Sequence, residues 1–129
     1  INLLNNPKTI FVSSFILGNN IINLKKNGNS YISCLGEINC SEYLKNTGIK
    51  SMSISPKFIS IKRSESGDAI VISKEFLGEF LIYKVSINGN ILRVRTDINN
   101  LLNNGDKCSL SINKNSYYFL YPGAYKEYI

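Results

Sequence analysis

The sequence predicts an all-β, mainly antiparallel fold of partly open β-barrels, with one short helix near the N-terminus. Two Asn-Gly turn signals are each flanked by alternating apolar residues, which is typical of β-hairpins. Further turn signals recur about every ten residues, as in barrels and sandwiches. Hydrophobic residues make up 43% of the 129 positions, enough for one core and too many for a disordered chain. No run approaches the ~18 apolar residues of a membrane-spanning helix.

The first segment carries the helix signal. Asn6 suits an N-cap, Pro7 suits the first helical position, and Gly18 suits the end. Phe11 and Phe15 lie four residues apart, so a helix here would have one apolar face. Such a short helix is marginal in water, and we expect it to pack on another element.

These signals divide the chain into two parts. We expect residues 1–17 to form a connector with a short helix, and residues 18–129 to form the β-domain. The chain begins at Ile1 without a methionine. We therefore expect it to be cut from a longer protein, with a further domain upstream.

The clearest hairpin runs from Glu79 to Thr96 around Asn88-Gly89. A two-residue turn there fixes the register of the two strands. The pairs expected on the inner face are Val85 with Leu92, Tyr83 with Val94, and Leu81 with Thr96.

The outer face of this hairpin is basic. Lys84 is expected directly opposite Arg93, and Arg95 next to Ile82. Like charges directly opposite each other cost some stability, which suggests contact with an acidic partner or an anion. The alternative is a solvated face that protects a sheet edge from aggregation.

A second hairpin is predicted between Gly18 and Leu35, around Asn27-Gly28. Its register would place Leu24 opposite Tyr31, with the pair Ile22 and Ser33 further along. The two hairpins also begin alike: Phe15-Ile16-Leu17-Gly18 precedes this one, and Glu75-Phe76-Leu77-Gly78 precedes the other. This weak internal sequence similarity suggests two related β-units.

Aromatic residues gather near the C-terminus. They include Tyr117, Phe119 and Tyr121, which alternate along a predicted last strand. Alternation predicts core packing on one face and subunit contact on the other. The alternative is base stacking in a single-stranded nucleic-acid binder.

Known catalytic and metal-binding patterns are absent from the sequence. There is no histidine and no G-x-x-x-x-G-K-[ST] motif. The three cysteines, Cys34, Cys40 and Cys108, form no C-x-x-C pair, and we interpret them as reduced thiols. Fifteen basic residues against nine acidic ones give a net charge of +6, which favours no particular partner. We expect no catalytic residue, cofactor or metal in this span.

The order of these features resembles a known family: the TOBE domain, an OB-like regulatory module at the C-terminus of the ATP-binding subunits of ABC importers. Residues 5–12 and 15–20 look like its connector, and residues 54–59 lie where the family has an Arg-Pro-Glu segment. The Phe76-Leu77-Gly78 segment, the following hairpin and Gly105-Asp106 fit the closing part. Ser55 and Lys57 replace the usual arginine and glutamate, so no role is transferred to them.

This resemblance implies a function. Such domains pair with a second copy and hold two ATPase domains together during transport. It implies a homodimer, an upstream nucleotide-binding domain that holds ATP and magnesium, membrane permease subunits as further partners, and a cytoplasmic location at the inner face of the membrane. The strand Leu92-Arg93-Val94-Arg95 and the ending Leu120-Tyr121-Pro122-Gly123 look most like the ferric-iron branch.

Two other functions are compatible with the sequence. The basic charge and aromatic strands fit an OB-type single-stranded nucleic-acid binder, although nucleic acid is not the expected partner. Lys84, Arg93 and Arg95 would instead form the site of an oxyanion or metabolite sensor.

Overall fold

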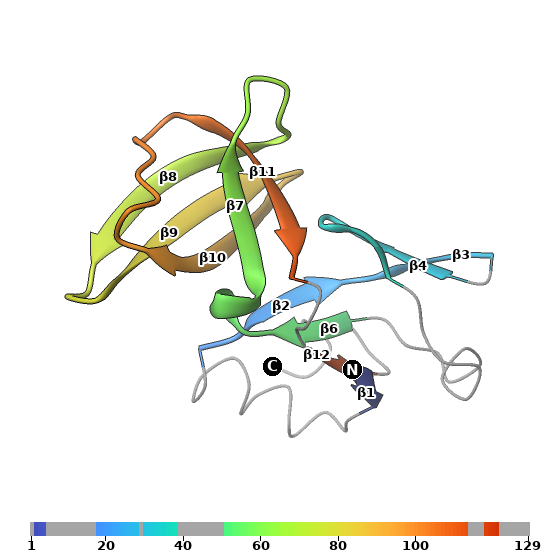
Figure 1. Ribbon diagram of the computed structural model, residues 1–129. Coiled ribbons are helices and arrows are strands. Elements are labelled where there is room, and N and C mark those ends of the chain that lie inside the picture. The colour runs from blue at the N-terminus through green and yellow to red at the C-terminus, as the bar shows by residue number, and fades with distance from the viewer. Residues whose placement is uncertain (1, 5–17, 29, 39–50, 114–117, 122–129) are drawn as a thin grey trace. The chain divides into compact units, whose positions relative to one another are not determined.

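A computed structural model describes residues 2–4, 18–28, 30–38, 51–113 and 118–121 (Figure 1). The fold is all-β with mainly antiparallel sheets, as the sequence predicts, and the described residues contain no helix of seven or more residues. The predicted helix over residues 6–17 lies outside the described residues. The chain divides into two compact units: unit 1 comprises Ile1–Ser55 and Asn115–Ile129, and unit 2 comprises Pro56–Lys114.

Unit 1 contains two described sheets. The first has the order β1-β12-β6-β2 and the second the order β3-β4-β5. Their strands are β1 (Asn2–Leu4), β2 (Asn20–Asn23), β3 (Lys25–Asn27), β4 (Ser30–Ser33), β5 (Gly36–Ile38), β6 (Ser51–Ile54) and β12 (Tyr118–Tyr121). All four residues of β6 are buried, as expected for an interior strand. Only the β1–β12 pairing is parallel among the described strands.

The hairpin predicted between Gly18 and Leu35 exists as β3–β4, but its predicted register is wrong. Asn27 lies opposite Ser30, so Tyr31 faces Lys26 and not Leu24. Gly28 has a φ of 61°, so the turn lies one residue later than expected. Ile22 belongs to β2 in the other sheet, where it pairs with Met52 of β6 and not with Ser33. The slip is two residues, so each side chain stays on its predicted face, although all three residues of β3, including Lys26 opposite the buried Tyr31, are exposed.

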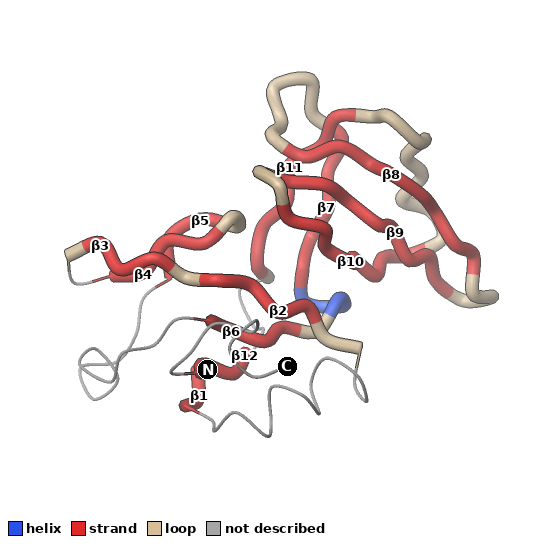
Figure 2. Tube along the Cα trace, turned by 180° about the vertical axis from the view of Figure 1, so that it is seen from behind, coloured by secondary structure: helices blue, strands red, loops and turns tan. Residues whose placement is uncertain are grey.

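Unit 2 is a five-stranded antiparallel sheet with the order β10-β9-β8-β11-β7. A 3₁₀ turn, η3 (Pro56–Phe58), leads into it. The strands are β7 (Ile59–Arg63), β8 (Ala69–Phe76), β9 (Phe80–Ile87), β10 (Asn90–Asp97) and β11 (Lys107–Ile112). Strands β8, β9 and β10 are joined by hairpins, and β11 returns to lie beside β8, which is a Greek key. Figure 2 shows this arrangement from behind.

The register of the β9–β10 hairpin confirms the prediction. Val85 lies opposite Leu92, and Tyr83 lies opposite Val94. Asn88 and Gly89 both have positive φ, 48° and 80°, as a type I′ turn requires. The inward residues of this hairpin are buried, and together with β7, β8 and β11 they form the core of unit 2.

A β-bulge helps the sheet to curl. It lies between Val71 and Ser73 of β8, where the pairing with β9 shifts by one residue. Bulges increase the local twist of a sheet. At this point the amide of Gly105 donates to the carbonyl of Val71, and the amide of Val71 donates to the carbonyl of Asp106, at 2.7 and 3.0 Å. The edge strands β7 and β10 come close together but are not paired, so the described strands form no closed barrel.

Gly67 allows the β7–β8 loop to lie directly on β11. A Cβ atom at this position would lie 2.1 Å from the carbonyl oxygen of Cys108. We predict that Gly67→Ala lowers the free energy of unfolding by about 1–3 kcal/mol, because backbone must move to admit the methyl group. Urea unfolding would measure this. Ser66→Ala is the control in the same loop, and an equal effect of the two changes would contradict the prediction.

Candidate functional site

A pocket of about 460 Å³ lies in unit 2 where the edge strands β7 and β10 approach each other. We call it the seam pocket. Its volume is within the range of small-molecule sites, roughly 300–1,000 Å³. Ile59, Ile61 and Phe80 supply apolar lining. The charged and amide side chains that line it are Lys57, Glu79, Arg95, Asp97, Asn100 and Asn113.

Asn100 joins the two sides of the seam. Its Nδ2 donates to the carbonyl of Ile61 on β7 and to Oγ1 of Thr96 on β10, at 3.1 and 3.0 Å. A strand edge leaves backbone carbonyls without ladder partners, and this amide satisfies one of them. The side chain therefore replaces a backbone pairing that the two edge strands do not make.

Two cations at the pocket rest on aromatic rings. The guanidinium carbon of Arg95 lies 3.8 Å from the centroid of the Phe80 ring, its diagonal neighbour on the hairpin. Nζ of Lys57 lies 5.1 Å from the centroid of the Phe58 ring. The electron-rich ring face attracts each cation without neutralising it. Both groups therefore keep N–H donors for another partner.

Asn113 organises the opposite wall. Its side chain bonds Oγ of Ser60 and donates to the carbonyl of Lys57, and its backbone amide donates to the carbonyl of Phe58 at 2.9 Å. These bonds hold the 3₁₀ turn to the end of β11. Lys57 is thereby placed at the pocket by contacts to residues far away in sequence.

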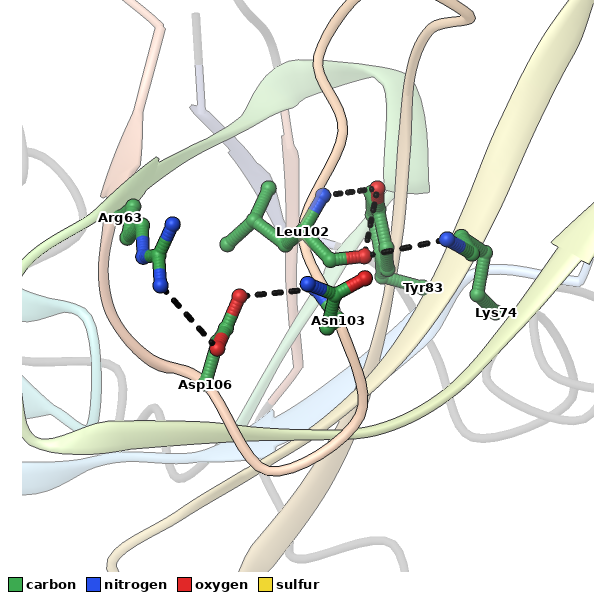
Figure 3. A network of polar contacts seen from close by, with 6 residues as sticks. All are labelled: Arg63, Lys74, Tyr83, Leu102, Asn103 and Asp106. Carbon is green, nitrogen blue, oxygen red and sulfur yellow. Dashed lines mark hydrogen bonds and ion pairs between the residues drawn. The ribbon is translucent and has the colours of Figure 1, made fainter.

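Tyr83 anchors the loop between β10 and β11, which supplies Asn100, and Figure 3 shows its hydroxyl bonded to Leu102 of that loop. Its hydroxyl donates to the carbonyl of Asn100 and accepts from the amide of Leu102, both at 2.8 Å. Nζ of Lys74 donates to the carbonyl of Leu102 at 3.2 Å. Tyr83 is fully buried, so these bonds satisfy a hydroxyl that would otherwise be costly to bury.

Asp106 fixes the far end of the same loop (Figure 3). Its carboxylate accepts from the amide of Asn103 at 2.8 Å and forms an ion pair with Arg63 at 3.6 Å. Residues 103–106 form a turn, because the backbone amide of Asp106 donates in return to the carbonyl of Asn103 at 3.0 Å.

The structure separates the three predicted anion-contact residues. Lys84 lies opposite Arg93, and Arg95 lies opposite Ile82, as predicted. All three basic side chains are exposed, but only Arg95 lines the seam pocket. Of the predicted dimer or packing residues, Tyr117 lies outside the described residues. Phe119 and Tyr121 belong to β12, which is paired on both sides by β1 and β6.

Most of the seam pocket was not anticipated from the sequence. Glu79, Asp97 and Asn100 lie at or beyond the ends of predicted strands, where polar residues usually mark turns. The one local signal in the sequence is the diagonal position of Arg95 and Phe80 on the same face of the two paired hairpin strands. The residues that η3 and β7 supply to the pocket could not be predicted, because their position depends on the order of strands in the sheet. No short stretch of sequence indicates that order.

Two thiols are perturbed by their surroundings. Burial raises the pKa of Cys108 above its ordinary value, and the Asp106 carboxylate raises it further. Burial also raises the pKa of Cys34, partly offset by a backbone hydrogen bond. Within the described ranges, no three His, Cys, Asp or Glu side chains come together to hold a metal ion.

No model of a known protein family matches the chain, and no curated protein matches it. In the described part of the chain, no helix has the length and apolar character needed to cross a membrane.

Tyr83→Phe tests the loop anchor. The change leaves the buried amide of Leu102 without its acceptor, and we expect a loss of about 1–3 kcal/mol in the free energy of unfolding. Lys74→Met removes a donor from an exposed residue of the same network and should cost less. Urea unfolding of both variants checks this order, and the reverse order would contradict it.

Cys108 should make stability depend on pH. The folded state binds the thiol proton more tightly than the unfolded state, so the free energy of unfolding falls as pH rises above the ordinary pKa of a thiol, 9.0. Cys108→Ala should reduce this fall, measured as urea midpoints between neutral and alkaline pH.

Burial should also protect the Cys108 thiol from reagents. In a Cys34→Ser/Cys40→Ser variant, iodoacetamide should modify Cys108 much faster in urea than in buffer. Equal rates would show that the thiol is accessible in the folded protein.

Proposed function

We propose that this chain is a non-catalytic regulatory and dimerisation module, of the OB-like TOBE type, of the ATP-binding subunit of an ABC importer. The observation that carries the proposal is the architecture of unit 2. It is a five-stranded antiparallel Greek key whose edge strands approach without pairing, which agrees with a partly open OB-like barrel. The assignment to an importer rests on the sequence motifs, whose order resembles the TOBE family. The same resemblance favours ferric iron as the transported solute.

Unit 2 also offers a surface for pairing. Ile70 and Ile91 lie on either side of Ser86 in the sheet register, and their side chains are 45% and 56% exposed. Exposed apolar side chains in one row of a sheet are typical of contact surfaces. We call Ile70, Ser86 and Ile91 the outer row, and we assign it to contact with a second copy.

Self-association tests the dimerisation role. We expect sedimentation over a concentration series to show a monomer–dimer equilibrium, and Ile91→Glu to weaken it at least about tenfold because a charge would be buried. Leu101→Glu is the matched control, since Leu101 is 68% exposed elsewhere in unit 2. A monomer up to the millimolar range would overturn the dimerisation role.

The importer parentage has a separate test. The coding sequence upstream of Ile1 should contain a Walker A lysine and an ABC signature, which supply the ATP and magnesium site. Their absence from an upstream coding region would overturn the importer assignment. Salt-sensitive binding of single-stranded oligonucleotides would favour the nucleic-acid alternative.

A further inference from the structure

The geometry points to the seam pocket as a binding site for a small zwitterion with an apolar side chain, namely a free α-amino acid. This inference concerns unit 2 alone and does not depend on the importer assignment. It rests on four charged side chains at the pocket: Lys57, Glu79, Arg95 and Asp97.

These four groups do not neutralise one another. In the described parts of the chain, none of them makes an ion pair, and the ion pair found in unit 2 joins Arg63 to Asp106. Arg95 and Lys57 are instead held over the rings of Phe80 and Phe58. Two fixed cations and two carboxylates are thus available to a ligand in the same pocket.

The carboxylates lie at the open end of the hairpin. Asp97 is the register partner of Phe80, and Glu79 immediately precedes Phe80. Both N–H groups of the Asn100 amide are used within the seam, which leaves its Oδ1 to accept. These oxygens suit an ammonium group. Arg95 suits the ligand carboxylate, because a guanidinium can bind it with two parallel hydrogen bonds.

The balance of charge selects the ligand class. A free phosphate or sulfate would meet Asp97 and Glu79, and a divalent cation would meet Arg95 and Lys57, so either would be repelled by half of the site. A zwitterion places one charge near each kind of group. The apolar part of the wall comes mainly from the partly exposed ring of Phe80, beside the buried Ile59 and Ile61, and this part can contact an apolar ligand side chain.

Binding should be tested on the full chain with leucine as the probe, by calorimetry and chemical-shift titration at low salt. We expect saturable binding that weakens with added salt, because the four charged residues are exposed. N-acetyl-leucine lacks the ammonium and leucinamide lacks the carboxylate, and each should bind at least about tenfold more weakly than leucine. Absence of leucine binding up to about 10 mM, or equal binding of all three, would overturn the inference.

Variants locate the site. Arg95→Gln and Asp97→Asn should each weaken leucine binding at least about tenfold, with unfolding midpoints near that of the parent chain. Arg93→Gln is the matched control, because Arg93 lies on the same strand and the same face but outside the pocket. Unchanged affinity in Arg95→Gln, or an equal loss in Arg93→Gln, would show that leucine does not bind at the seam. Dimerisation is measured without ligand, so failure of either proposal leaves the other standing.

Discussion

The structure of unit 2 depends on one buried hydroxyl. Tyr83 is in the middle of the sheet, yet it bonds the loop that crosses from β10 to β11. That crossing lets β11 return beside β8 and completes the Greek key. A buried polar group is costly unless it is satisfied, so the loop can take its place only in the conformation that bonds this hydroxyl. Chain connectivity and core packing are therefore coupled at a single residue.

The seam is a consequence of this arrangement. The bulge at Val71 curls the sheet, and β7 and β10 come close without forming a ladder. Open strand edges carry unsatisfied backbone groups, and Asn100 satisfies one of them by reaching across to Ile61. Asn100 lies on the loop that Tyr83 anchors. That loop therefore also determines where a side chain connects β7 to β10 and where the pocket lies between them.

The charges around the pocket are held apart by packing. Arg95 lies over Phe80, so its guanidinium is attracted by a ring rather than by a neighbouring carboxylate. Asp97, two residues later on the same strand, keeps its carboxylate for another partner. Opposite charges that face one pocket without pairing form a recognition pattern. A structural salt bridge would have removed that pattern.

The sequence by itself determined the β9–β10 hairpin, its register and its two faces. Asn88-Gly89 selects a type I′ turn, and that turn fixes every pair beyond it. The register of the hairpin between Gly18 and Leu35 could not be determined in this way, because Ile22 pairs with Met52 of β6, a strand distant in sequence. The seam pocket was likewise decided by tertiary structure. It combines residues from η3, β7 and β10, and only the sheet order brings those segments together.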